Sequence, residues 1–373
     1  MSSTFGRNIR IGVFGQSHGA AVGCTVEGLP AGFAPDIDAL TEFVKRRSPG
    51  RFPWDTRRTE DDAPHIISGL NARGATCGAP LCILVENADT RSHDYENLSY
   101  VPRPGHADYP AWVKWGGEND IYGGGHFSAR IMAPLTAAGG IALQILEKNG
   151  IRIAAHLLEI DGLRDAPFTW YDASADGLAR LRSEMDALAD GRDFPVLDTN
   201  TGEVMKRRIL DTKAELDSVG GICECVATGL PVGVGSPLFD NLESQLSHAL
   251  FGIPAVKGIE FGAGFATARM LGSENNDPYE IRDGQVALRT NNAGGILGGL
   301  STGAPLRLAL AFKPISSIGR EQDSVDLVAM EPAKLSVRGR HDVCAAVRAV
   351  PIVEAVCALV LLDALVEDFP IEV

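Results

Sequence analysis

The sequence predicts an α+β fold in which sheets and helices form layers around one core. Short β-branched segments and long apolar helical segments occur along the chain without a regular strand–helix alternation, which argues against a doubly wound sheet. Hydrophobic residues make up 45% and charged residues 22% of the 373 residues, a composition typical of a soluble globular protein. We find no fixed-period repeat and no low-complexity linker, so a single domain is expected over residues 1–373.

The N-terminal part is expected to hold four strands and one helix. β-branched and apolar runs between glycine or proline turns predict strands at 8–15, 24–30, 65–70 and 80–87. Helical spacing over 36–47 begins at Asp36, a candidate N-cap. Residues 88–126 are polar, rich in proline and glycine, and expected to be irregular. An irregular stretch of this length is often functional.

The remainder is expected to mix helices and strands. Strands are predicted at 151–160, 220–231, 255–265 and 306–312. Helices are predicted at 127–150, 241–252, 341–366 and within 174–218, where a loop is expected near 191–203. Pro351 is expected to break or kink the last helix.

The charge balance excludes some classes of partner. The chain has 48 acidic residues against 34 basic ones, a net charge of −14, so neither nucleic acid nor an anionic membrane is an expected partner. Of the basic residues, 26 are arginine and 8 are lysine. Six of these cations lie within residues 44–58, beside the single acid Asp55. This segment is either an ordinary solvated face or part of an anion-binding pocket, and composition alone favours neither.

The cysteines and the hydropathy indicate a cytoplasmic protein. The seven cysteines have irregular spacing and include no CxxC pair, so we expect reduced structural thiols and no metal site. The N-terminus has no apolar run typical of a signal peptide. The longest apolar stretch, 355–362, is too short to span a bilayer and suits a buried helix.

Two nucleotide-binding motifs are missing, and one hydrolase motif occurs in the wrong context. No GxGxxG follows a strand and no GxxxxGK[ST] is present. GQSHG at 15–19 matches the G-x-S-x-G pattern of serine hydrolases, but the residues after it do not predict a helix. A nucleophilic role for Ser17 is therefore disfavoured, although Ser17 and His18 together could form a path for a proton.

Several loops carry groups that could bind or transform a ligand. In RPGHADYP (103–110), His106 stands in a stiff turn between Arg103 and Asp108, where a catalytic histidine and a solvated one are about equally expected. GGGHFSAR (123–130) places Ser128 and Arg130 at the start of a helix, either as a phosphate site or as a turn capped by Ser128.

Three further segments are weak signals when taken singly. NNAGGILGGLSTG at 291–303 would let a ligand approach the backbone closely. KPISS at 313–317 supplies a lysine and two hydroxyls directly after a strand, and GRHD at 339–342 groups charged residues before the last helix.

Taken in order, these segments resemble chorismate synthase. The resemblance runs from about residue 5 to 366 and rests on GQSHG, RPGHADY, GGGHFSAR, AVKGIEFG, NNAGGILGGLSTG, KPISS, GRHD and the RAVP that follows. It implies a β-α-β sandwich and the conversion of 5-enolpyruvylshikimate 3-phosphate to chorismate and phosphate. This is an anti-1,4-elimination at the last common step of the shikimate pathway. It also implies a requirement for reduced FMN, without net redox change, and a homotetramer.

The resemblance assigns roles to matching positions. His18 resembles the histidine that protonates the leaving phosphate, and His106 the one that stabilises reduced FMN. Asp342 resembles the aspartate that works with flavin N5, while Ser17 and Ser128 resemble serines of a proton relay. The arginines that match substrate contacts are Arg47, Arg103, Arg130 and Arg340. The positions that match flavin contacts are His126, Phe127, Ser128, Pro254, Ala255, Gly298, Lys313, Pro314, Ile315, Ser316, Ser317 and Arg340.

The chain also departs from the family pattern. His126 and Phe127 stand where many members have Arg and Ser, and Pro53, Pro254 and Val343 replace an Arg, an Asn and a Pro. His18, His106, Ser128 and Asp342 are unchanged, so an active enzyme is expected. The alternative is a flavin-binding relative without activity. No nicotinamide site is visible, so an external flavin reductase is expected, although some relatives reduce FMN with NADPH themselves.

Overall fold

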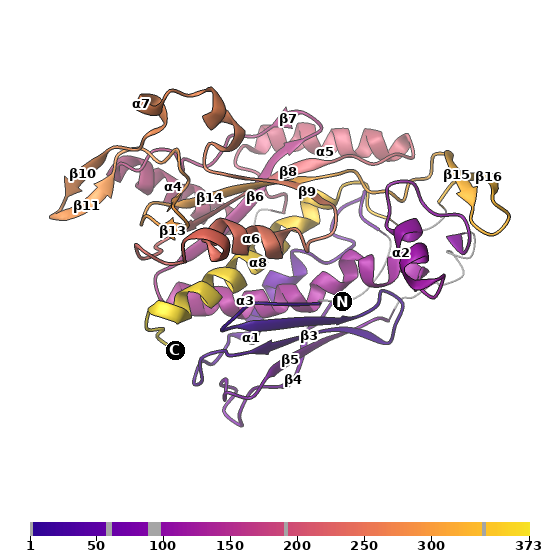
Figure 1. Cartoon of the computed structure of the whole chain (residues 1–373), viewed down its shortest axis with the longest axis horizontal. Coiled ribbons are helices and arrows are strands. Elements are labelled where there is room, and N and C mark those ends of the chain that lie inside the picture. Colours follow the sequence, from indigo (N-terminus) through magenta and orange to yellow (C-terminus); the bar gives the residue numbers. More distant parts are fainter. Residues whose placement is uncertain (1–2, 57–61, 89–97, 190–192, 338–340) are drawn as a thin grey trace.

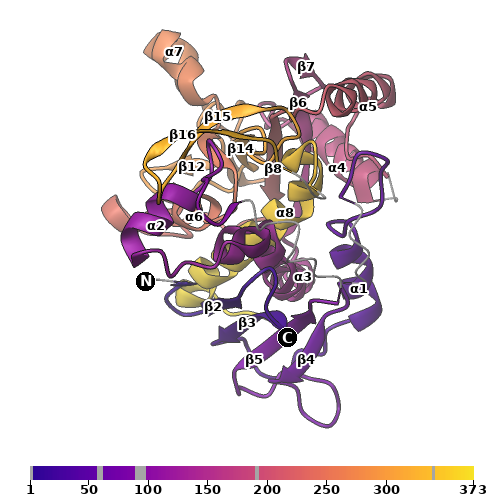
Figure 2. The ribbon, with the colours of Figure 1, turned by 90° about the vertical axis from the view of Figure 1, so that its right-hand side faces the viewer.

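Two five-stranded antiparallel sheets enclose a layer of two long helices, α3 and α8. The structure is a computed structural model and describes residues 3–56, 62–88, 98–189, 193–337 and 341–373. Figure 1 shows one sheet below and one above the two helices, and the view turned by 90° in Figure 2 shows the same three layers. The expected α+β class and β-α-β sandwich are therefore confirmed.

The first sheet packs one face against α3. Its strand order is β1-β2-β3-β5-β4, with bounds Thr4–Phe5, Arg10–Gly15, Ala21–Glu27, Leu81–Glu86 and His65–Ser68. In β5, residues 81, 83 and 85 are buried and alternate with less buried ones, the pattern of a strand with one covered face. Helix α1 (Ile37–Lys45) packs beside α3 and begins, as expected, at Asp36, whose carboxylate accepts from Ala39 N at 2.9 Å.

The second sheet is covered on both faces. Its order is β7-β6-β8-β14-β9, with bounds Leu163–Arg164, Arg152–Ile160, Gly221–Thr228, Leu306–Phe312 and Val256–Phe261. Its inner face meets α8, and α4 (Ala175–Ala189) packs on its outer face. The next helix in the chain, α5 (Thr199–Ala214), contacts the edge strand β7. Residues 223–227 of β8 are buried without interruption, as expected of a strand between two layers.

A buried ionic cluster joins β6, β8 and β14 on the outer side of this sheet. His156 Nε2 lies 3.1 Å from Glu224 Oε2, and its Nδ1 lies 3.3 Å from Asp165 Oδ2. Arg307 Nε donates to the other oxygen of Glu224 at 2.8 Å. Burial lowers the pKa of His156, but the two carboxylates outweigh it and the pKa is raised. The imidazole therefore carries its charge more readily here than in water.

The two helices of the middle layer form the centre of the core. α3 spans Met132–Lys148 and α8 spans Ala345–Asp368. They approach so closely that a Cβ on Gly139 would lie 2.3 Å from the Cβ of Ala355. The helical stretches Ala129–Lys148, which contains α3, and Ala345–Asp368 are long and apolar enough to cross a membrane, but 83% and 94% of their most apolar segments are buried in the protein. Their hydropathy is thus explained by their place in the core.

Three expectations for the secondary structure were wrong. Within 88–126, residues Asp108–Trp115 form α2. The helix predicted from 127 begins at Met132, because Gly123, Gly124 and Gly125 adopt left-handed φ and two 3-10 turns, η2 (Tyr122–Phe127) and η3 (Ala129–Ile131), come first. Of the break or kink expected at Pro351, the break does not occur, because α8 continues through this residue.

Of the remaining elements, α6 packs against α8 and contributes Leu242, Leu246 and Leu250 to the core. Two hairpins, β10–β11 and β15–β16, project at opposite ends of the molecule (Figure 1). The bounds are Leu238–Asp240 for η4, Leu242–Leu250 for α6, Gly264–Arg269 for η5, Gly272–Asn275 for α7, Tyr279–Arg282 for β10, Gln285–Leu288 for β11, Ile296–Leu297 for β12, Leu300–Ser301 for β13, Gln322–Asp326 for β15 and Glu331–Leu335 for β16.

Candidate active site

A cavity of about 530 Å³ lies where the N-terminal ends of α3 and α8 meet. Its walls come mainly from segments that are far apart in the sequence, at 103–107, 123–131, 251–256, 313–317 and 341–352. Because both helix starts reach the cavity, the positive ends of two helix dipoles favour an anionic ligand there.

Most of the site residues expected from the sequence line this cavity. Those that do are Ser17, Arg47, Arg103, His106, His126, Phe127, Ser128, Arg130, Pro254, Ala255, Lys313, Ile315, Ser316, Ser317 and Asp342. Among the described residues, His18 and Pro314 do not line it but directly adjoin Ser17 and Lys313. Gly298 does not line it either and lies in the turn between β12 and β13. Arg340 lies outside the described residues.

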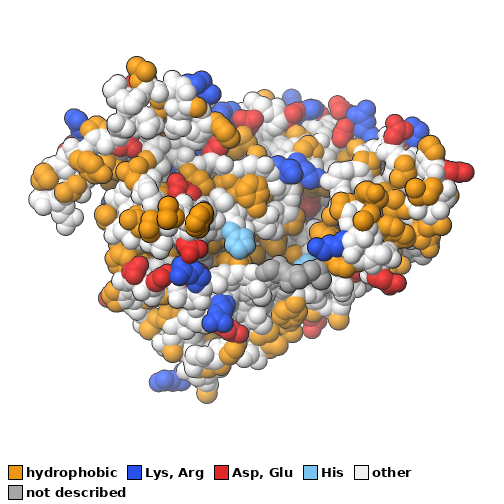
Figure 3. Space-filling model, viewed as in Figure 1, with side chains coloured by type: hydrophobic (Ala, Val, Ile, Leu, Met, Phe, Trp, Pro, Cys, Tyr) orange, Lys and Arg blue, Asp and Glu red, His pale blue; other side chains and the backbone are white. Residues whose placement is uncertain are grey.

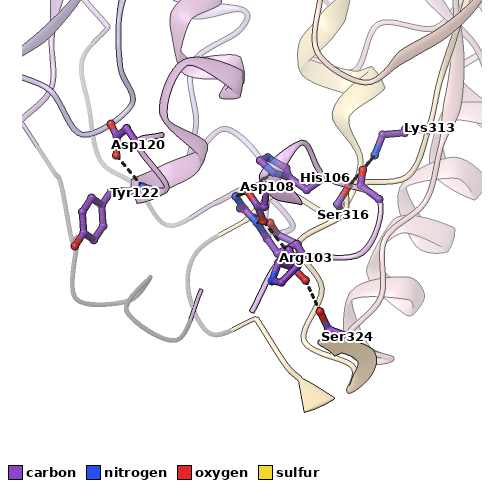
Figure 4. Close-up of polar contacts among 11 residues, drawn as sticks. Arg103, His106, Asp108, Asp120, Tyr122, Lys313, Ser316 and Ser324 are labelled. Atoms are coloured by element: carbon purple, nitrogen blue, oxygen red, sulfur yellow. Dashed lines mark hydrogen bonds and ion pairs between the residues drawn. The ribbon is translucent and has the colours of Figure 1, made fainter. Parts of the chain in front are cut away.

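Arg103, His106 and Asp108 form one compact cluster at the start of α2. Asp108 accepts hydrogen bonds from Arg103 Nε at 2.7 Å, Arg103 Nη2 at 2.8 Å and the backbone N of Arg103 at 3.0 Å. His106 Nδ1 lies 2.5 Å from Asp108 Oδ1. Figure 4 shows the three side chains converging on the carboxylate. Burial raises the pKa of Asp108, but the bonds from Arg103 and His106 outweigh it and hold that pKa far below its usual range.

This cluster fixes which nitrogen of His106 faces a ligand. An ionised Asp108 can only accept, so Nδ1 of His106 carries a hydrogen and Nε2 remains for other partners. A Cβ at Gly124 would lie 3.5 Å from Nε2, so glycine at this position leaves room beside the ring. The imidazole is therefore held in one orientation with Nε2 available.

A second cluster joins two buried arginines through one carboxylate. Asp62 Oδ2 accepts from Arg47 Nη1 at 2.7 Å, and its Oδ1 accepts from Arg130 Nη1. Arg130 also donates to Asn87 Oδ1 and to the carbonyl of Glu86, both at 2.8 Å. Burial raises the pKa of Asp62, but the two guanidinium groups outweigh it and lower that pKa. Burial also lowers the pKa of Arg47, to about 10.

A third pair sits at the start of α8. Asp342 accepts from Arg348 Nη1 at 2.5 Å and from the backbone N of Thr56 at 3.0 Å. Arg348 Nε donates to the carbonyl of Arg47 at 2.8 Å, which connects this pair to the second cluster. The carboxylate expected to act in catalysis is thus fixed by contacts to both of its oxygens.

The KPISS segment closes another side of the cavity. Lys313 Nζ donates to Ser316 Oγ at 2.7 Å and to the carbonyl of Gly105 at 2.9 Å, as Figure 4 shows for the serine. Arg103 Nη1 lies 3.2 Å from Ser317 Oγ. Burial, helped by the charge of Lys257, lowers the pKa of Lys313. This segment therefore ties the second sheet to the loop that carries His106.

The GQSHG segment meets the glycine loop. Ser17 is buried, and its backbone N donates to the carbonyl of Gly125 at 3.1 Å. His18 stacks with Tyr122 at a centroid distance of 6.5 Å. His126 Nδ1 lies 3.0 Å from the carbonyl of Gly15. Since GQSHG connects β2 to β3 and no helix follows it, Ser17 does not sit on a nucleophile elbow.

Two residues in these clusters were missed from the sequence. Asp62 is one of several acids in a polar segment, and nothing in its spacing marks it. Arg348 belongs to the RAVP motif, so that motif was the available signal. On the face seen in Figure 3, acidic and basic side chains are intermixed. The net charge of −14 thus coexists with a cavity that Arg47, Arg103, Arg130 and Arg348 line.

Comparisons with known proteins agree over almost the full length. The chorismate synthase family model matches residues 9–366. A chorismate synthase of Lancefieldella parvula is 53% identical over 367 residues, covering 98% of this chain and 96% of that protein. One of Korarchaeum cryptofilum is 42% identical over 359 residues, covering 96% of each.

A solved structure agrees with these sequence matches. A crystal structure of a chorismate synthase has a TM-score of 0.73 and 25% identity, covering 98% of this chain and 95% of that one. Similarity in both sequence and fold along nearly the whole chain shows that it belongs to the chorismate synthase family.

Proposed function

We propose that this chain converts 5-enolpyruvylshikimate 3-phosphate to chorismate and phosphate, as a carbon–oxygen lyase acting on a phosphate ester. The observation that carries the proposal is the set of buried arginines that line one cavity together with His106 and Asp342. The substrate carries two carboxylates and a phosphate, and forked guanidinium groups match such anions. Family membership supports the same reaction.

Reduced FMN is the proposed cofactor, and the cavity residues fit it. The apolar wall at 251–256 and the ring of Phe127 suit a flavin ring system, while Lys313 and the two hydroxyls beside it suit polar ring atoms or a phosphate. Arg47 Nε is buried and has no hydrogen-bond partner among the described residues, as expected where an anionic ligand completes a site. The bound cofactor would supply the electron chemistry of the elimination.

The protein's own groups would then act on the substrate. Arg47 and Arg130 would neutralise an anionic group, and His18 would give a proton to the departing phosphate, with Ser17 and Ser128 relaying protons. Asp108 would keep His106 in one orientation, so that Nε2 can hold or donate a proton at the cofactor. Asp342, fixed by Arg348 and Thr56, would act at the hydrogen that leaves C6.

Other parts of the proposal rest on the family alone. We propose a single domain over residues 1–373, a homotetramer, a cytoplasmic location and reduction of FMN by an external flavin reductase or with NADPH. Gly298, Pro314 and Arg340 remain proposed ligand contacts by resemblance. An assay with NADPH and oxidised FMN tests whether the chain reduces its own cofactor.

The decisive assay is anaerobic, with dithionite-reduced FMN and the enolpyruvyl substrate. We expect release of phosphate and formation of chorismate in equal amounts. Binding of FMN without release of phosphate would instead identify a flavin-binding relative that has lost activity. His106→Ala should bind FMN but slow turnover strongly, and wild-type turnover in that variant would contradict its catalytic role.

A serine hydrolase is the alternative that the GQSHG motif suggests. Labelling of Ser17 by a fluorophosphonate probe would support it. We expect no labelling, because Ser17 is buried and lies between two strands.

A further inference from the structure

We infer that Asp62 is a positioning residue: a resident counter-anion that holds Arg47 and Arg130 in place and shares them with the anionic group of the ligand. The inference rests on the proposed function, because it assigns the ligand's anion to these two arginines. The three side chains come from the end of α1, the segment before β4 and the turn before α3. They meet only in the folded protein.

The geometry gives each oxygen of Asp62 to a different arginine. Arg47 is 2% exposed, Asp62 3% and Arg130 5%, so water contributes little to solvating these charges. Oδ2 accepts from Arg47 and Oδ1 from Arg130. Because a carboxylate shared in this way fixes both guanidinium groups at once, it sets their mutual orientation.

Among the described residues, the single carboxylate of Asp62 faces two guanidinium groups, those of Arg47 and Arg130. Arg348 also lowers the pKa of Arg47, but it is paired with Asp342, which raises that pKa, so this pair adds no net charge. Arg47 Nε, buried and lacking a hydrogen-bond partner among the described residues, is a further unmet donor. The side chains of Arg47, Arg130 and Asp62 therefore sum to one positive charge, and Arg47 Nε offers an N–H without a partner among the described residues, which an incoming anion can accept from.

Asp62 has opposite effects on the empty and the occupied site. In the empty site it separates two buried like charges that would otherwise repel each other. In the occupied site it lies close to the ligand's anion and competes with it for the same donors. Removing its charge should therefore destabilise the empty protein and strengthen the binding of an anion.

Asp62→Asn isolates this charge. Asp62 has a left-handed backbone with φ of 49°, a conformation that asparagine also tolerates, so the substitution keeps size and backbone. It removes the charge and leaves one acceptor oxygen, so one of the two arginines loses its partner. Glu354→Gln is the matched control. Glu354 is also buried and pairs with Arg46 at 2.7 and 3.0 Å, but neither residue lines the cavity.

The first measurement is the melting temperature of the full chain in increasing inorganic phosphate, at ionic strength held constant with chloride. We expect both variants to melt below the wild type in chloride. Phosphate should stabilise Asp62→Asn with a dissociation constant about tenfold lower than in the wild type, while Glu354→Gln should respond to phosphate as the wild type does. An equal phosphate response in Asp62→Asn and wild type would overturn the inference.

The second measurement separates kcat from KM in the phosphate-release assay. Misplaced arginines should lower kcat of Asp62→Asn about 100-fold, whereas KM should not rise, because the arginines keep their charge. Wild-type kcat, or a raised KM with unchanged kcat, would contradict a positioning role. The phosphate titration does not require turnover. If the wild type is inactive, the proposed function is refuted, but the titration still tests the role of Asp62.

If Asp62→Asn does not fold, the double variant Asp62→Asn with Arg47→Gln decides. It removes one charge of each sign and so returns the net charge of the cluster to its wild-type value. Recovery of a folded protein in the double variant supports the counter-anion, and failure of both variants to fold contradicts it.

Discussion

Replacing Asp108 by asparagine should weaken both the fold and the catalysis of this enzyme. The carboxylate accepts three hydrogen bonds from Arg103 and one from His106, at 2.5–3.0 Å. An asparagine side chain has one acceptor oxygen and one NH2 donor. Its NH2 group would therefore face N–H donors of Arg103 or His106 in place of an acceptor. Breaking a buried ion pair in this way costs about 3–5 kcal/mol, a large share of the stability of a protein.

The catalytic effect follows from the same contact. Without the carboxylate, Nδ1 of His106 is no longer held as the protonated nitrogen, so Nε2 loses its fixed role. General acid–base steps contribute about 100-fold or more, and turnover should fall by that order. Urea unfolding gives the first quantity and anaerobic phosphate release the second. Asp120→Asn is the control, since Asp120 accepts only from the backbone N of Tyr122 among the contacts found, at 3.0 Å. Asp108→Asn that unfolds and turns over like this control would refute the reasoning.

Three further predictions concern stability. Gly139→Ala should cost about 1–3 kcal/mol because its Cβ would meet Ala355 on the facing helix, whereas Gly140→Ala, whose Cβ meets only side-chain ends, should cost less; urea unfolding compares the pair. The pKa of His156 is raised in the folded protein, so the charged imidazole stabilises the fold fully below pH 6.5, and this stabilisation is lost as the pH rises through the pKa of the folded state. The unfolding free energy of the wild type should therefore fall over that pH range. The same pH dependence in His156→Gln would contradict this. Ala255 has a φ of 74°, which is strained for any residue except glycine, so Ala255→Gly should raise the unfolding free energy by up to about 1 kcal/mol. A lower urea midpoint in Ala255→Gly would be evidence against strain there.

Local patterns predicted most of the elements. β-branched runs located the longer strands of both sheets but not the two-residue strands β1 and β7, and Asp36 located the start of α1. Helix α2 was missed because the polar, proline- and glycine-rich composition of residues 88–126 predicts irregular structure. Pro110 is the third residue of α2, in the first turn, where a helix tolerates proline. The break expected at Pro351 is also absent. α8 is buried on all sides, and this packing stabilises the helix on both sides of the proline.

The site was predicted where the chemistry is local and missed where it is not. His106 and Asp108 are two residues apart, so the turn RPGHADYP already placed them near each other. The pairing of Asp62 with Arg47 and Arg130 depends on three elements meeting in the folded protein, and no spacing in the sequence records it. Which arginines line the cavity likewise depends on how the two sheets and the middle helices pack together.

The middle layer has a consequence for how the chain matures on the ribosome. α3 is made early and α8 is the last described helix to emerge, some 200 residues later. Until α8 has emerged, the second sheet lacks the helix that covers its inner face. Asp342, the carboxylate proposed to act in catalysis, is made only three residues before α8 begins. Completion of the core and assembly of the proposed site therefore both depend on the synthesis of α8. Until α8 packs against the second sheet, the nascent protein exposes apolar surface to chaperones, and no chain that still lacks α8 can be active.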